Sequence, residues 1–444
     1  MSDLILQAAQ AEKTTPLPWL ADFQQLQNNT WLRQAVPTRK TEAWRYTPLN
    51  RLEKGNFFGA PAQVHECSEC LQEQISLPDA NGDELDCYRL VFVNGFYAES
   101  LSALGELQTG VSLCRFGDAN EAQQSAIKTH LGTIANDSVN LFTTLNNSQL
   151  QEGVLLSLDD GVVLDKPLRI LWLGSAQAVP FSVTQRLLVL MGANSQAMVL
   201  EQHLSDDAEQ NSFTNGVTEL SLGEGAQLHH YRLHQEHESV LHIGGVFADL
   251  GKNSLLNSFH LAFGSVLTRI DIVVNHRGQG AHSELSGIYL PRNNQYVDYH
   301  TCIEHRVPNC TSNEVFRGII GDSARAVFNG RIHIHRDAQK TSAKLSNKNL
   351  LTSNRAEIDS KPELEIYADD VLCAHGATIS QIEDEALHYL RTRGISDQEA
   401  RVLLSFGFIN TLIEKIPHTE IAEYLRPKLA VLFARDPELL RHIV

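Results

Sequence analysis

The sequence predicts a mainly β protein with helical ends, divided into an N-terminal helical or mixed region (1–150), a β-rich core (151–380) and a C-terminal helical domain (381–444). Three observations predict this division. Helical periodicity is absent from Val154 to Thr378, where short β-rich runs alternate with turn residues. A small glycine motif recurs through the same region. After Thr378 the apolar residues change to a spacing of about 3.6 residues, which is typical of helices.

Length and charge limit the class of protein. A chain of 444 residues is long for one core and indicates two or three domains. Its formal net charge of −17 argues against a general binder of nucleic acid or anionic membranes, because phosphates would be repelled. The longest apolar runs, such as Leu187 to Met191, are the size of strands, so no membrane span is expected.

The compartment is expected to be cytoplasmic. The N-terminus has no basic stretch followed by an apolar core, so it does not resemble a secretory signal. The seven cysteines are scattered, without the dense pattern of a small disulfide-bonded domain, which fits a reducing environment.

Residues 1 to about 60 are predicted to be helical, because large apolar residues recur there at helix-like spacings. They are Trp19, Leu20, Phe23, Leu26, Trp31 and Leu32. Trp44 and Tyr46 are expected to anchor this segment by packing on the rest of the protein. Further along, residues 88–95 are typical of a strand ending in a turn, and residues 119–130 of a helix.

The motif of the core is a glycine followed three positions later by alanine or serine and then by apolar residues. It begins at Gly192, Gly223, Gly251, Gly278 and Gly321, at intervals of 31, 28, 27 and 43 residues. The first three intervals match the periods of solenoids, and the last is long enough to hold an extra excursion of the chain. We expect each glycine to form a corner with positive φ, and the small residue to let stacked coils approach. Such corners also occur in β-sandwiches, so the motif alone leaves both folds open.

The C-terminal domain is predicted to hold three helical stretches. Ile382, Ala386, Leu387 and Leu390 share one helical face, and Gly394 stands where a helix C-terminus belongs. A capping box at residues 396–399 opens the next helix. Residues 419–433 form the last stretch.

The candidate site lies where the core meets this domain. If residues 371–375 are extended, Val371, Cys373 and His375 point to one face, with Asp369 and Asp370 just before them. Residues 376–378 are expected to break the strand. A thiol and an imidazole two residues apart are suited to chemistry, but on residue types alone a buried small thiol and a hydrogen-bonded structural histidine are the preferred explanation.

Two other groups of residues are candidate metal ligands. Cys67 and Cys70 have C-x-x-C spacing, but no second pair follows, so two thiols on a polar segment are preferred. Histidines also crowd the core, at positions 229, 230, 234, 237, 242, 300, 305, 333 and 335. His333 and His335 share a strand face, but no carboxylate or thiol lies at a matching short spacing. We therefore expect these imidazoles to form ladders on the outer face of the coils.

Two stretches resemble a known family. Residues 360–408, SKPELEIYADDVLCAHGATISQIEDEALHYLRTRGISDQEARVLLSFGF, closely resemble the C-terminal signature of the SufB/SufD family, the scaffold proteins of the SUF iron–sulfur cluster assembly system. The form CAHGAT at 373–378 is similar to the SufD branch, because SufB more typically has Glu between His and Ala. Residues 37–49, PTRKTEAWRYTPL, are similar to the N-terminal motif of that branch.

This resemblance implies a fold and partners. It implies a right-handed parallel β-helix core, which decides between solenoid and sandwich. It implies pairing with SufB through the end of the β-helix at 361–375, a homodimer when SufB is absent, and docking of the ATPase SufC on the C-terminal helical domain. The role implied is a non-catalytic scaffold that also contributes to iron acquisition.

The resemblance also implies a site. The cluster would form at the junction with SufB, where a SufB cysteine faces His375. Cys373, on the same face, is a second candidate as a ligand or sulfur acceptor, and burial as a small apolar side chain explains it at least as well. Asp369 and Asp370 are candidates to orient the imidazole by general metal-site chemistry, which the resemblance does not specify. A transient iron–sulfur cluster would be shared with SufB, and this chain alone would hold no permanent cofactor.

Two other classes compete with the scaffold: a β-helix enzyme acting on polysaccharide, and a metal-binding protein built on the histidines. The sequence has no G-x-x-x-x-G-K-[ST], no glycine-rich dinucleotide turn and no G-x-S-x-G elbow. We therefore expect no enzymatic activity, with energy supplied by a partner.

Overall fold

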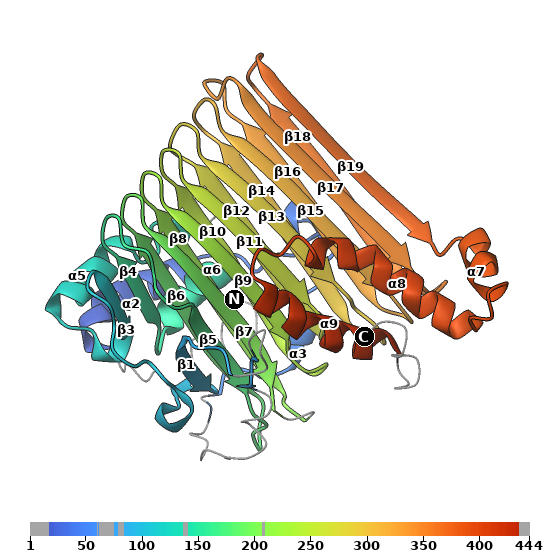
Figure 1. Ribbon diagram of the computed structural model, residues 1–444. Helices are drawn as coiled ribbons and strands as arrows, with labels where there is room; N and C mark the ends of the chain where they lie inside the picture. The colour runs from blue at the N-terminus through green and yellow to red at the C-terminus, as the bar shows by residue number, and fades with distance from the viewer. Residues whose placement is uncertain are drawn as a thin grey trace.

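The computed structural model describes residues 17–59, 61, 75–78, 84–135, 141–206 and 209–434, with side chains to residue 432. These residues are mostly β and form a parallel β-solenoid of about eight turns, with helices at both ends of the chain (Figure 1). Cys67 and Cys70 lie outside the described residues. None of the described helices has the length and apolar character needed to cross a membrane.

Two sheets make up the solenoid within the described residues, and consecutive strands of the core alternate between them. The ten-stranded sheet has the order β19-β17-β15-β13-β11-β9-β7-β5-β1-β2, and the nine-stranded sheet the order β18-β16-β14-β12-β10-β8-β6-β4-β3. The strands are β1 (Tyr88–Val93), β2 (Phe96–Tyr97), β3 (Val111–Arg115), β4 (Val154–Leu158), β5 (Leu168–Gly174), β6 (Phe181–Met191), β7 (Gln196–Ser205), β8 (Ser212–Leu222), β9 (Gln227–Gln235), β10 (Leu241–Leu250), β11 (Leu255–Ala262), β12 (Leu267–His276), β13 (His282–Tyr289), β14 (Tyr296–His305), β15 (Thr311–Ile320), β16 (Arg325–Ile334), β17 (Thr341–Leu351), β18 (Glu357–Ile366) and β19 (Val371–Gln381).

Each strand of the core pairs in parallel with the strand one coil earlier and one coil later. For example, β12 pairs with β14 so that Thr268 lies beside Val297 and His276 beside His305. Parallel pairing between strands that are not consecutive is the pattern of a solenoid, whereas a sandwich is built mostly from antiparallel neighbours. The expected β-helix is therefore confirmed.

Alternate side chains of every strand point into the lumen, the space that the two sheets enclose. The half of the lumen next to the corner of Gly278 is mainly apolar, because it is filled by residues such as Leu220, Leu256, Ile272 and Phe328. The buried pair of His276 and His305 lies there too. Burial of these stacked apolar rows is the main stabilising contribution that each coil receives from its neighbours.

The glycines of the motif lie at the corners, but the expected reason for them was wrong. The residues with positive φ are Asn194, Gly225, Asn253, Gly280 and Asp322, which follow the first glycine of each motif. The first glycine is needed for space: a Cβ on Gly278 would lie 2.0 Å from the backbone nitrogen of Lys252 in the preceding corner. The small residue that ends each motif is fully buried, as expected.

The 43-residue interval between Gly278 and Gly321 does not have the expected cause. Gly278 lies in the corner between β12 and β13, whereas Gly321 lies in the corner between β15 and β16. These are opposite corners of the coil, so the interval is one and a half coils. It contains no extra excursion.

The N-terminal region covers the outer face of the nine-stranded sheet. Its helices are α2 (Ala21–Trp31), α3 (Asn50–Lys54), α5 (Glu121–His130) and α6 (Leu141–Gln149). Trp44 packs with Phe142 and Phe213 on this face, and the guanidinium of Arg269 lies 3.9 Å from the centre of its ring. The expected packing role of Trp44 is therefore observed, and Tyr46 contributes its carbonyl, which accepts a 2.5 Å hydrogen bond from the Tyr296 hydroxyl.

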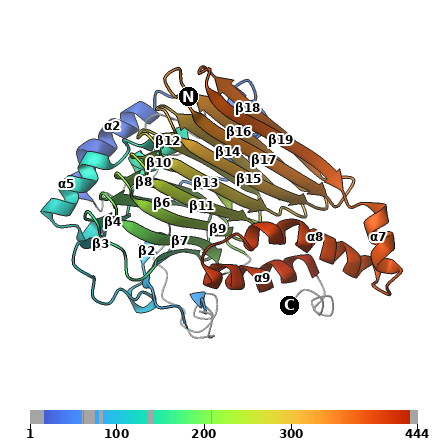
Figure 2. The ribbon, with the colours of Figure 1, turned by 45° about the horizontal axis from the view of Figure 1, so that its top comes forward.

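The C-terminal helices α7 (Asp384–Arg391), α8 (Asp397–Ile413) and α9 (Thr419–Ala434) lie beside the ten-stranded sheet (Figure 2). The capping box of Ser396 and Glu399 is present, and Gly394 has a φ of 84°. Apolar residues of α8 and α9 pack on the outer face of the sheet, where Ile409 and Leu425 share a cluster with Phe259. These residues therefore belong largely to the interface with the β-helix.

One end of the solenoid is closed and the other is bare. At the N-terminal end, β2 and β3 pair antiparallel with β1 and β4 and so interrupt the parallel stack. At the C-terminal end, β18 and β19 are the last described strands of their sheets. The expectation that residues 376–378 break the strand was wrong, because β19 continues to Gln381. Its pairing with β17 through Leu351 supplies the backbone hydrogen bonds across Gly376.

The corner geometry yields the first testable prediction. Replacing Gly278 by Ala should lower the free energy of unfolding by about 1–3 kcal/mol, because the added methyl overlaps the backbone of the preceding coil. Urea unfolding followed by circular dichroism measures the change. The matched control is Gly407→Ala in α8, where an added Cβ meets nothing within 4 Å. That control should leave stability unchanged or raise it by up to about 1 kcal/mol. Equal stability of Gly278→Ala and wild type would contradict the space argument.

Candidate functional site at the end of the solenoid

The last coil, formed by β18 and β19, is the outer edge of the stack (Figure 2). Large apolar side chains are exposed on it: Ile366, Tyr367, Leu372 and Ile379. Leu372 is 76% exposed. An uncovered strand also offers free backbone donors and acceptors, so this edge is suited to pairing with another strand.

Cys373 and His375 lie on the same face of β19. They are paired with Ala343 and Leu345 of β17, whose side chains lie in the lumen. Both residues of β19 therefore continue the lumen face into the open end. Cys373 is half-buried against the lumen core, and His375 is exposed.

Burial decides the state of the Cys373 thiol. Burial raises its pKa above the usual value of 9.0, and a backbone hydrogen bond at Ala343 offsets only part of this. At neutral pH the group is a thiol, and the thiolate that binds metals forms only when an incoming metal displaces the proton.

The structure does not bring Asp369 or Asp370 to His375. Both are exposed in the turn before β19, and the backbone of Asp370 is held by Gln339 and Lys340 of the preceding coil. Five residues of extended strand span roughly 16 Å, which separates the Asp370 carboxylate from the imidazole. No hydrogen bond or ion pair joins either carboxylate to His375 in the described part of the chain.

The end of the solenoid offers too few ligands to hold a metal by itself. Among the described residues, no group of three potential ligands includes Cys373 or His375. A metal bound there would need ligands from another molecule.

A second cluster of potential ligands lies on the outer face of the nine-stranded sheet. Nδ1 of His333 and Nε2 of His335 lie 2.9 and 2.6 Å from one carboxylate oxygen of Glu304. Burial alone would raise the pKa of Glu304, but the two imidazoles have the larger effect and lower it below its usual value. Short spacings along the sequence do not reveal this carboxylate. Glu304 pairs with His333 across neighbouring coils, and the coil period is the signal that finds it.

The expectation that the other histidines lie on the outer face was wrong for several of them. His230, His234, His242 and His305 are fully buried and point into the lumen. His203, which no short sequence pattern indicates, lies beside His234 in the ladder between β7 and β9. Again the neighbour is one coil away, so only the register of the stack reveals it.

Comparisons with known proteins show which protein family this chain matches. Residues 173–408 match the family described as SUF system FeS cluster assembly, SufBD core domain. Residues 3–170 match the family described as SufBD protein N-terminal region. Together the two matches span most of the chain.

Curated relatives agree with the family matches. An iron–sulfur cluster assembly SufBD family protein of Synechocystis is 30% identical, and the alignment covers 88% of this chain and 86% of that protein. The iron–sulfur cluster assembly protein SufD of Escherichia coli is 31% identical, over 87% and 86% of the two chains. A chloroplastic protein of Arabidopsis thaliana, ABCI7, is 27% identical over 89% and 82%.

Proposed function

Since this chain belongs to the SufBD family of the SUF iron–sulfur cluster assembly system, we propose that it is a non-catalytic scaffold subunit on which clusters are assembled. The observation that carries the proposal is the bare last coil, with Cys373 and His375 on the face that continues the lumen. The iron and sulfide of the cluster are its cargo.

Pairing with SufB through this end is the first part of the proposal. Exposed apolar residues and an uncovered strand edge both favour a protein partner with its own β-structure. A second copy of this chain is the partner when SufB is absent, because the same surface then remains to be covered.

The second testable prediction concerns this surface. The double variant Leu372→Asp and Ile379→Asp should abolish co-purification of SufB and should make the isolated chain monomeric, because it puts two charges into an apolar interface. Pull-down and light scattering after gel filtration measure the two effects. Val179→Asp is the control, since Val179 is 63% exposed near the closed end of the solenoid. Retained SufB binding by the double variant would contradict the assignment.

His375 is the proposed ligand for the nascent cluster. Imidazole is a borderline ligand that binds iron, and it completes mixed cysteine and histidine cluster sites. Its position on a strand that is hydrogen-bonded along its whole length fixes the direction of the side chain. Because the described end of this chain supplies no complete set of ligands, the other ligands are proposed to come from SufB, including a cysteine. Cys373 is the second candidate ligand from this chain.

The third testable prediction is that His375→Ala abolishes cluster formation and leaves the complex with SufB and SufC intact. An exposed side chain is removed, so folding should be unaffected. Cluster absorbance and iron and sulfide content of the purified complex give the yield. Cys373→Ala should retain most of the yield, and His130→Ala, at the end of α5, should retain all of it. A normal yield from His375→Ala would refute the ligand role.

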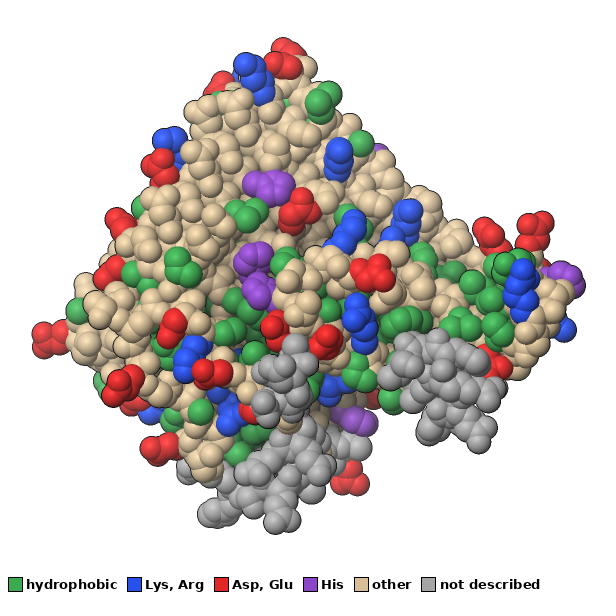
Figure 3. All heavy atoms as spheres, in the orientation of Figure 1, with side chains coloured by type: hydrophobic (Ala, Val, Ile, Leu, Met, Phe, Trp, Pro, Cys, Tyr) green, Lys and Arg blue, Asp and Glu red, His purple; other side chains and the backbone are tan. Residues whose placement is uncertain are grey.

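Docking of the ATPase SufC is proposed for the C-terminal helices, and α7 is the best candidate. Whereas α8 and α9 bury apolar residues against the sheet, α7 projects away from it (Figures 1 and 2). Apolar side chains gather around α7 on the molecular surface (Figure 3). Tyr389 is 56% exposed there, and the guanidinium of Arg393 stacks on its ring at 3.5 Å.

The fourth testable prediction is therefore that Tyr389→Asp weakens SufC binding strongly and leaves SufB binding unchanged. The charge disrupts an exposed aromatic contact without touching the face that packs on the solenoid. Leu26→Asp is the matched control, because Leu26 is an exposed apolar residue of α2. Binding of SufC to both variants with wild-type affinity, measured by calorimetry, would remove α7 from the proposed interface.

A further inference from the structure

We propose that His203, His234 and His242 form a buried site for one divalent transition-metal ion, with the carboxylate of Glu236 beside it. One ring nitrogen from each imidazole lies within 4.8 Å of those of the other two. The site is separate from the open end of the solenoid. The inference is independent of the proposed function, because it uses residues of this chain alone.

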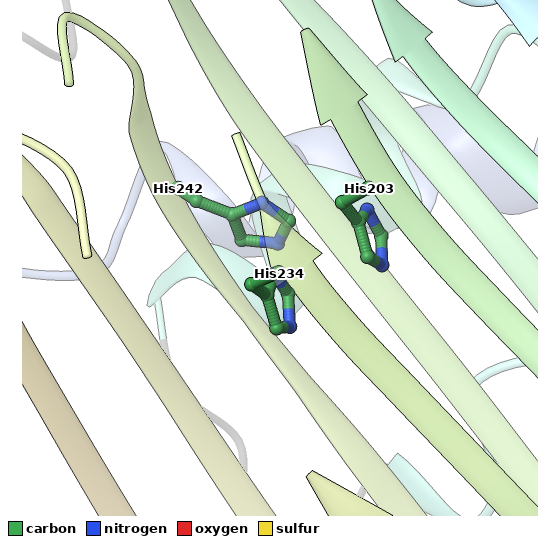
Figure 4. Close-up of side chains that lie close together, drawn as sticks. All are labelled: His203, His234 and His242. Atoms are coloured by element: carbon green, nitrogen blue, oxygen red, sulfur yellow. The ribbon is translucent and has the colours of Figure 1, made fainter. Parts of the chain in front are cut away.

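The register of the coils brings the three imidazoles together. His203 of β7 and His234 of β9 are neighbours in the ten-stranded sheet, and their rings stack with centres 4.5 Å apart. His242 is the second residue of β10 in the other sheet, and its ring lies nearly perpendicular to the other two rings, with centres 4.9 and 4.5 Å away. Figure 4 shows the pair on adjacent strands with His242 facing them.

Most ring nitrogens of this cluster have no hydrogen-bond partner among the described residues. Neither nitrogen of His203 is hydrogen-bonded, and neither is Nε2 of His242. Nδ1 of His234 also lacks a hydrogen bond, although it lies 3.6 Å from a carboxylate oxygen of Glu236. All three side chains are at most 2% exposed. A buried polar atom without a partner costs about 1–3 kcal/mol, so four such atoms in one place indicate a site that a ligand completes.

Two ring nitrogens of the cluster have hydrogen-bond partners, and these partners fix which nitrogen of each imidazole carries the lone pair. Nδ1 of His242 lies 2.7 Å from a carboxylate oxygen of Glu236, which directs the opposite nitrogen, Nε2, into the cluster. A carboxylate that fixes a histidine in this way is typical of metal ligands. Nε2 of His234 accepts a 3.2 Å hydrogen bond from Nε of Arg232, so Nε2 carries the lone pair of this imidazole and Nδ1 carries its proton, 3.6 Å from Glu236. A metal would bind His234 through Nε2 and would replace the hydrogen bond from Arg232.

The charges also favour a cation. The described ion pairs of Glu236 are with His234 and His242, and its side chain is 6% exposed. A buried carboxylate needs a positive charge nearby. Arg232 is the nearest permanent cation of the cluster, but it is paired with Glu201, whose Oε1 also accepts from Thr218 and contacts His230. A divalent ion would supply the missing charge.

Protonation is compatible with this role. Burial, and then the charge of Arg232, hold the pKa of His203 well below its usual range; burial and the neighbouring histidines do the same for His234. Neutral imidazoles keep a lone pair for a metal. Three imidazole ligands suit borderline ions such as Zn²⁺ or Fe²⁺, with the Glu236 carboxylate beside them to offset the charge, and binding would draw the nitrogens to about 3.3 Å from one another.

A second buried histidine cluster shows what a satisfied arrangement looks like in the same lumen. His276 and His305 share a 2.8 Å contact between their Nδ1 atoms, and their Nε2 atoms contact Ser283 and Ser312. Every ring nitrogen of that pair has a partner within the protein. The cluster of His203, His234 and His242 differs from this pair because several of its ring nitrogens have no hydrogen bond.

The test uses the full-length chain without a histidine tag, purified from cells grown with added Zn²⁺ or, anaerobically, with added Fe²⁺, so that metal is available while the chain folds. His333→Ala and His335→Ala are introduced together first, which removes the surface cluster with Glu304. After gel filtration with a chelator, mass spectrometry should find one metal per chain. X-ray absorption of this protein should show imidazole ligands at about 2.0 Å.

His242→Ala and His203→Asn, each added to that background, should lose the metal. Circular dichroism checks that both variants fold. If either does not fold, the X-ray absorption of the parent protein still tests whether imidazoles bind the metal. Less than a tenth of an equivalent of metal in the parent protein, or a bound metal without imidazole ligands, would overturn the proposal. So would retention of the metal by folded variants.

Discussion

The stacking of coils in register is the constraint on which the rest of the structure depends. Each strand of the core hydrogen-bonds along its length to the same strand of the previous coil, at a spacing of about 4.8 Å. A residue is therefore packed chiefly against its equivalents in neighbouring coils. This explains why Gly251 and Gly278 admit no side chain, since each corner lies directly on the corner before it. It also explains why Glu304 meets His333, and His203 meets His234.

A stack of this kind has two outer faces and two ends that must be covered. In this chain, different elements cover the two faces, and only one of the two ends is covered. Helices of the N-terminal region cover the outer face of one sheet, and α8 and α9 cover part of the other. The N-terminal end is closed by antiparallel strands. The C-terminal end is bare, and it is the place where Cys373 and His375 extend the lumen face. An open end that would otherwise favour aggregation is a natural place for an obligatory partner.

The lumen is divided along its width. Toward the corner of Gly278 it is packed mainly with aliphatic and aromatic side chains, together with the pair of His276 and His305, and toward the opposite corner it holds arginine, glutamate and histidine. Such groups are costly to bury unless they are paired. Arg232 is paired with Glu201, whereas Glu314, with Thr301 as its hydrogen-bond partner, has its pKa raised to about 8 by burial and is a neutral acid at pH 7. The lumen thus contains two sets of polar groups. The groups of one set pair with one another, whereas those around His203 leave ring nitrogens without hydrogen bonds.

The sequence by itself determined the local features of this protein. Period-two runs between turn residues specify the strands, the box at Ser396 and Glu399 specifies the start of α8, and the pattern around residues 373–378 identifies the family. Only the tertiary structure decided which residues meet across coils. The sequence placed His234 and His242 on the outer face and ended the last strand before Gly376. It could not do otherwise, because side-chain alternation gives two faces without saying which one is enclosed, and because a strand's length depends on the partner that supplies its hydrogen bonds.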